Sequence, residues 1–130
     1  MDPLPRDATD AQLLRYVDEW VALLEAEDYD AAFRHTDHDP FAGWSADLLR
    51  FSIKSYGAGT ASQRATLTGE PTDIDVCREV TRWSTPRPAG VGQIWYDLYI
   101  DGRASDLTAT FWIVSVPGGL VLQLEAIHVM

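Results

Sequence analysis

The spacing of hydrophobic positions changes along the chain, and the change predicts two kinds of structure. In residues 10–27 the apolar side chains recur every three or four positions, which is typical of an amphipathic helix. In residues 93–100 and 107–114 apolar and other side chains alternate one by one, which is typical of strands. The pattern therefore predicts helices in the first half of the chain and an antiparallel sheet in the second.

Three helices are expected in the first half. The first spans residues 10–27 and begins after Thr9, which forms a capping box with Gln12. A short second helix is expected over residues 31–35, and a third between its N-cap Ser45 and a stop at Gly57. The apolar stripe of the first helix consists of Leu13, Val17, Trp20, Val21 and Leu24.

Five strands are expected after Gly59, joined by turns rich in glycine and proline. They span residues 63–68, 76–83, 93–100, 107–116 and 120–129, and Pro117-Gly118-Gly119 separates the last two. Three helices followed by antiparallel strands predict one α+β domain over residues 1–130, in which a curved antiparallel sheet packs on the helices.

Composition narrows the classes of partner. The chain has 130 residues and a net charge of −10, without a cluster of Lys and Arg, which disfavours nucleic acid. Such a surface is compatible with plain solubility or with a basic protein partner. Cys77 is the only cysteine, so the chain has no internal disulfide and a reducing compartment is expected. No segment resembles a leader or a membrane span, so a cytoplasmic protein without a membrane partner is expected.

The order of elements resembles the NTF2-like superfamily, which includes SnoaL-like and ketosteroid-isomerase-like proteins. The resemblance rests on the opening helix, the Asp-Tyr-Asp-Ala-Ala-Phe turn at 28–33, the third helix ending in Tyr56-Gly57 and the long closing strands. The segments 105–110 and 127–130 resemble small bacterial domains of unassigned function. The resemblance implies a cone-shaped sheet with a pocket between its concave face and the helices. The superfamily includes enzymes, binders and immunity proteins of bacterial toxin systems, so it implies no single activity.

A pocket in such a cone would take its polar groups from Tyr56, Tyr96 and His128. The alternation of the last strand predicts that His128 points inward, where a histidine could act as a general base, orient a ligand or form part of a hydrogen-bonded core. Asp97 and Glu125 are expected on the opposite face, away from the pocket. The carboxylate, tyrosine and protonated acid of the isomerase branch cannot be matched, so no catalytic residue and no cofactor are assigned.

The opposite face of the sheet is rich in aromatic residues. A patch of this kind is larger than monomers normally leave open, and Trp and Tyr are enriched at interface hot spots. Because NTF2-like proteins commonly pair through this surface, a homodimer is expected, with loops of the chain as the alternative cover. The candidate interface residues are Trp83, Trp95, Tyr99, Trp112 and Ile127.

The run His35-Thr36-Asp37-His38-Asp39 combines two imidazoles with two carboxylates. Metal binding would require a third converging ligand, which the sequence does not offer, so a solvated loop without metal is the expectation. Cys77 is expected to be a buried, inert thiol.

Two functional classes remain. The first is a non-catalytic binding protein, such as an immunity-type or regulatory partner, supported by the acidic balance and the aromatic face. The alternative is a protein that binds a small apolar molecule in the cone, or an isomerase-like or hydrolase-like enzyme that acts there. The first is preferred because no catalytic set is assembled, although catalytic groups in this fold come from scattered elements.

Overall fold

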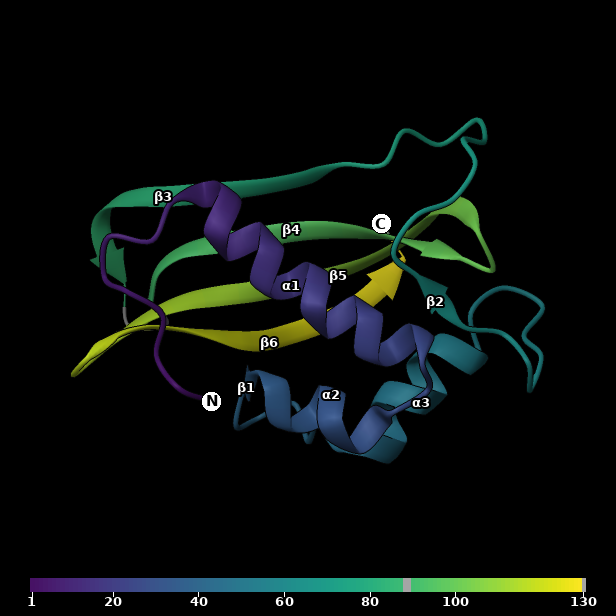
Figure 1. Cartoon of the computed structure of the whole chain (residues 1–130), viewed down its shortest axis with the longest axis horizontal. Helices are drawn as coiled ribbons and strands as arrows, with labels where there is room; N and C mark the ends of the chain where they lie inside the picture. Colours follow the sequence, from purple (N-terminus) through teal and green to yellow (C-terminus); the bar gives the residue numbers. More distant parts are fainter. Residues whose placement is uncertain (88–89, 130) are drawn as a thin grey trace.

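The computed structural model describes residues 1–87 and 90–129. It is an α+β structure in which three helices pack on a strongly curled, half-barrel sheet (Figure 1). The helices are α1 (Asp10–Glu25), α2 (Tyr29–His35) and α3 (Ala46–Lys54). The strands are β1 (Asp37–His38), β2 (Ala65–Thr66), β3 (Arg78–Arg87), β4 (Gly90–Ile100), β5 (Arg103–Val116) and β6 (Gly119–Val129).

The described residues form a six-stranded sheet in the order β1-β6-β5-β4-β2, and β3 also pairs with β4. All pairs are antiparallel except β1 with β6. Helix α1 crosses β4 and β5 on the concave side (Figure 1), where the indole of Trp20 meets the ring of Phe111 edge-on at 5.1 Å between ring centroids. The predicted division into helices first and an antiparallel sheet second is confirmed.

The helix starts follow the predicted caps. Gln12 N donates to Thr9 Oγ1 and Thr9 N donates to Gln12 Oε1, which completes the capping box of α1. Leu48 N donates to Ser45 Oγ at the start of α3. Helix α2 begins at Tyr29, two residues earlier than predicted, because Asp28 is its N-cap and the Asp28 carboxylate accepts from Ala31 N.

A β-bulge in β6 changes which residues face the helices. Thr110 pairs with Ala126 while Phe111 pairs with Leu124, so Glu125 is an extra residue on its strand. Beyond the bulge Ile127 lies opposite the core residue Ala109, on the concave side. His128 lies opposite Thr108, on the convex side. The predictions that His128 points inward and that Ile127 lies on the outer face are therefore wrong, because one inserted residue reverses the alternation.

The sheet edges also differ from prediction. The strand expected over 63–68 shortens to β2, because the Gln63 side chain turns inward and donates to the carbonyls of Ile53 and Tyr56. Between β2 and β3 the guanidinium of Arg78 covers the edge of β4, donating to Asp97 O and Leu67 O. Residues 37–38, expected in a loop, form the edge strand β1.

Within residues 1–87 and 90–129, no helix combines the length and the apolar character that crossing a bilayer requires.

Candidate functional site

The concave face of the sheet, where the resemblance places a pocket, is filled by side chains. Trp20 from α1 is fully buried there, as are Tyr96 from β4 and Phe111 from β5. These aromatic rings fill the space between the sheet and α1. The polar groups of this region either bond to protein partners or are enclosed.

The three predicted pocket residues do not form one cluster. Tyr96 OH donates to Asp18 Oδ1 on α1, and burial, with Asp18 adding to it, raises the pKa of this phenol. Tyr56 OH donates to Asp106 Oδ1, and burial and that carboxylate raise its pKa also. Tyr56 and His128 border one groove of about 350 Å³ between α3 and the end of β6, while Tyr96 is buried elsewhere.

The convex face brings three of the five predicted interface residues onto one surface. Trp83 and Trp112 lie 5.6 Å apart between ring centroids, and the Arg87 guanidinium stacks over Trp83 at 4.4 Å. Trp95 lies on the same face, since it pairs with Thr110, a neighbour of Trp112 on the outer side of β5. All three indoles are partly exposed.

The other two predicted interface residues are not part of this tryptophan cluster. Tyr99 is also partly exposed, and it lies beside the segment that precedes Glu70, because a Cβ on Gly69 would lie only 2.7 Å from the Tyr99 ring. Ile127 is on the concave side, because the β-bulge at Glu125 reverses the alternation of β6.

A buried carboxylate organises the convex face. Sequence reasoning placed Asp97 on this face, as the structure does, but gave it no role. Asp97 is 7% exposed. Its Oδ1 accepts from Trp95 Nε1 at 2.9 Å and from Thr108 Oγ1 at 2.6 Å, and its Oδ2 accepts from Cys77 N at 2.8 Å. The signal in the sequence was the row of alternating threonines in β5, whose hydroxyls need acceptors when buried.

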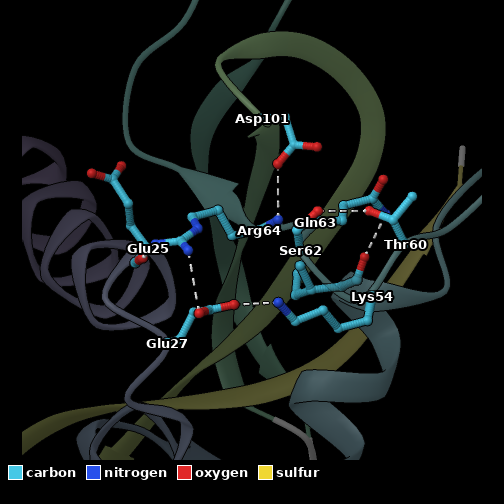
Figure 2. A network of polar contacts seen from close by, with 9 residues as sticks. Glu25, Glu27, Lys54, Thr60, Ser62, Gln63, Arg64 and Asp101 are labelled. Carbon is cyan, nitrogen blue, oxygen red and sulfur yellow. Dashed lines mark hydrogen bonds and ion pairs between the residues drawn. The ribbon is translucent and has the colours of Figure 1, made fainter.

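A second polar region lies where α1 ends, beside the last residue of α3. Figure 2 shows Glu27 between Lys54 and Arg64: Lys54 Nζ bonds to Glu27 Oε1, and Arg64 Nη2 lies 3.3 Å from Glu27 Oε2. Arg64 also donates from Nη1 to Glu25 O and from its backbone N to Asp101 Oδ1. The hydrogen bond from Lys54 lowers the pKa of Glu27. This network ties the end of α1 to α3 and to the β4–β5 turn.

The Glu27–Lys54 pair forms one wall of a cleft of about 450 Å³ between α2 and α3. Tyr29 and Arg50 also line it. Tyr29 is 8% exposed, and within the described residues its hydroxyl has no hydrogen-bond partner. Sequence reasoning took Tyr29 as part of a turn and assigned no role to Arg50, because nothing local in the sequence indicates that α2 and α3 face each other.

Both histidines of residues 35–39 pack against aromatic rings. The His35 ring stacks on Tyr16 and the His38 ring stacks on Phe33, each at 4.0 Å between ring centroids. Among the residues that the structure describes, no three His, Cys, Asp or Glu side chains converge as metal ligands. Cys77 is exposed, so the prediction of a buried thiol is wrong: the residue precedes β3, where only its backbone is held against Asp97.

The partly buried His38 predicts a loss of stability in mild acid. Burial lowers the pKa of His38 below its usual value, so the unfolded chain binds this proton more readily than the folded chain. The stability that neutral His38 contributes is complete above the pKa of the histidine in the unfolded chain, about 6.5. It is lost as the pH falls from there through the lower pKa of His38 in the folded chain. Urea unfolding over this range should show the decline in the wild type. His38→Phe should reduce the decline, and His128→Gln is the control; equal declines in all three would contradict the assignment to His38.

Comparison with known families adds one finding. A family model described as "Domain of unknown function (DUF7668)" matches residues 21–130, from the second half of α1 to the end of the chain. No curated protein and no solved structure matches the chain.

Proposed function

We propose that this chain, which belongs to the DUF7668 family, is a non-catalytic binding protein that holds a basic protein partner on the convex face of its sheet. The observation that carries the proposal is the surface formed by Trp83, Trp95 and Trp112, which come from three adjacent strands and are all partly exposed. The helices-first order and the curled sheet support the NTF2-like resemblance, and that superfamily includes immunity-type binders.

The chemistry of this surface favours a cationic partner. The indoles lie among the carboxylates of Glu79, Asp97 and Glu125, since Glu79 pairs with Trp95 and Glu125 accepts from Thr110 Oγ1. Indole faces attract guanidinium and ammonium groups, and nearby carboxylates strengthen the attraction. Arg87, stacked on Trp83, is an intramolecular example of the contact that an arginine of the partner would make.

A second copy of the chain is the competing occupant of this face. Pairing two convex faces would place the same carboxylates opposite one another in two chains that each carry a net charge of −10. Like charges at an interface oppose association, so the basic partner is preferred over the expected homodimer. The filled concave face favours surface binding over an internal small ligand, and the groove beside Tyr56 is where that alternative would be sought.

A displayed random-peptide library tests the proposal. Peptides selected on the wild type should be rich in Arg and Lys, and the double variant Trp83→Ala/Trp112→Ala should bind them at least about 30-fold more weakly, as hot-spot residues do. Phe51→Ala is the matched control, since Phe51 is an aromatic residue on α3 that is 65% exposed. Selected peptides without basic residues, or equal loss in the control, would contradict the proposal.

Sedimentation velocity distinguishes the two occupants of the convex face. The proposal expects a monomer in the absence of a partner. A dimer that the Trp83→Ala/Trp112→Ala variant dissociates would instead assign the face to a second copy.

A further inference from the structure

Strand β3 has one open edge. Among the described strands only β4 pairs with β3, and β3 runs along the upper margin of the sheet in Figure 1. Residues 78–82 pair with residues 92–96 in one regular antiparallel register. A strand at the edge of a sheet presents unpaired N–H and C=O groups, to which an extended segment of another chain can add.

The register shows which backbone groups of β3 face outward. Asp97 N donates to Cys77 O, so residue 77 and every second residue after it direct their backbone groups toward β4. The N–H and C=O groups of Arg78, Val80 and Arg82 point the other way, and no described residue bonds to them. These three residues therefore offer backbone donors and acceptors to a neighbouring strand.

The convex side of β3 is acidic and aromatic. Glu79 and Thr81 are exposed there, and the partly exposed Trp83 follows them. The Glu79 carboxylate forms no ion pair with any described residue. An added strand would place every second side chain beside this row.

The concave side of β3 carries the opposite charge. The Arg78 guanidinium lies 4.1 Å from the ring centroid of Tyr96, and Arg82 Nη2 lies 2.9 Å from Asp10 Oδ1. Val80, between the two arginines, packs against the core. The intervening side chains of an added strand would meet this row, where a further Lys or Arg is repelled.

The segment that leads into β3 adds negative charge near the open edge. Asp73 and Asp75 are exposed and form no ion pair with a described residue. Their charge attracts a cationic segment and opposes a second copy of this chain, which carries a net charge of −10. A basic extended segment is therefore the occupant that complements this edge.

Given the function proposed above, on which this step rests, we propose that the basic partner docks as an extended strand that pairs with the open edge of β3. Its backbone bonds to the outward groups of Arg78, Val80 and Arg82. Its basic residues recur at every second position and lie on the convex side, beside Glu79 and Trp83. The residues between them carry no positive charge, because they lie beside the two arginines. The alternation of basic and other residues is the pattern that the edge recognises.

Methylation of single backbone nitrogens tests the strand pairing. The probe is the tightest basic peptide selected on the wild type, synthesised as a series in which each version carries one N-methyl group. In an added strand every second N–H bonds to β3, so N-methylation should weaken binding about tenfold at alternate positions and little at the positions between them. Effects without this alternation, in a peptide that still depends on Trp83 and Trp112, would overturn the strand pairing and leave the proposed function standing. Selection of peptides without basic residues would overturn both.

Hydrogen exchange and one matched pair of variants give readouts from the protein itself. A saturating amount of the peptide should slow the exchange of the Val80 and Arg82 amides about tenfold or more, because both amides become hydrogen-bonded. Glu79→Gln should weaken binding about fivefold, whereas Glu19→Gln should not. Glu19 is the control because its side chain is 56% exposed and lies on α1 beside His35. Unchanged exchange of both amides in the complex, or equal losses in the two variants, would overturn the proposal.

Discussion

Replacing Trp20 by alanine is expected to lower the free energy of unfolding by about 3–5 kcal/mol. The indole is fully buried between α1 and the sheet, and its ring packs edge-on against Phe111. Truncation removes the largest side chain that joins the two layers and leaves a cavity that the surrounding strands cannot fill without moving. Urea unfolding followed by circular dichroism measures the loss.

Two further variants show that the effect depends on burial. Trp20→Phe should cost clearly less, because it retains an aromatic ring and removes an indole N–H that has no described hydrogen-bond partner. Trp112→Ala, on the convex face, should also cost less, since its indole is partly exposed. If Trp20→Ala and Trp112→Ala lowered the stability equally, the concave face would not be the core of the protein.

The local features of the fold were predictable from the sequence because their causes are local. The capping box at Thr9 and the N-cap at Ser45 both form as expected, since each depends on residues three positions apart. The apolar stripe of α1 is buried as predicted. The long strands were predicted closely for the same reason: alternation is a property of consecutive residues.

The features that were missed depend on contacts between distant segments. The bulge at Glu125 was missed because the original alternation could be continued through Ala126 to His128, although the large apolar positions change from Leu122 and Leu124 before the bulge to Ile127 and Val129 after it. The shortening of β2 depends on where the Gln63 amide finds its acceptors, in α3. The cleft between α2 and α3 requires Tyr29 and Arg50 to meet across two helices whose packing no local pattern specifies.

At both candidate surfaces, charged side chains lie beside a buried polar group. On the convex face the carboxylate of Asp97 is enclosed and fully used by protein donors, so it fixes the surface instead of binding a ligand. Beside the α2–α3 cleft the Tyr29 hydroxyl is enclosed and has no hydrogen-bond partner among the described residues.

Replacing Asp97 by alanine should also lower the free energy of unfolding by roughly 3–5 kcal/mol. The substitution leaves Trp95 Nε1, Thr108 Oγ1 and Cys77 N without their acceptor in a region where Thr108 is fully buried. Each hydrogen bond to a carboxylate contributes about 1.5–3 kcal/mol, and a buried donor left unpaired adds its desolvation cost. The measurement is urea unfolding at neutral pH, followed by circular dichroism.

Asp97→Asn and Glu125→Ala complete this test. Asparagine keeps one acceptor oxygen, which can serve Trp95 and Thr108, so it should lose about half as much stability as alanine. Glu125 lies on the same face but is partly exposed, and its bonds to Thr110 and Gln93 are longer, at 3.2 and 3.5 Å. Its replacement should therefore cost less than about 1 kcal/mol. A loss for Asp97→Ala no greater than that for Glu125→Ala would show that the buried carboxylate does not organise the convex face, and the tryptophan surface would then lack the fixed geometry on which the proposed partner binding depends.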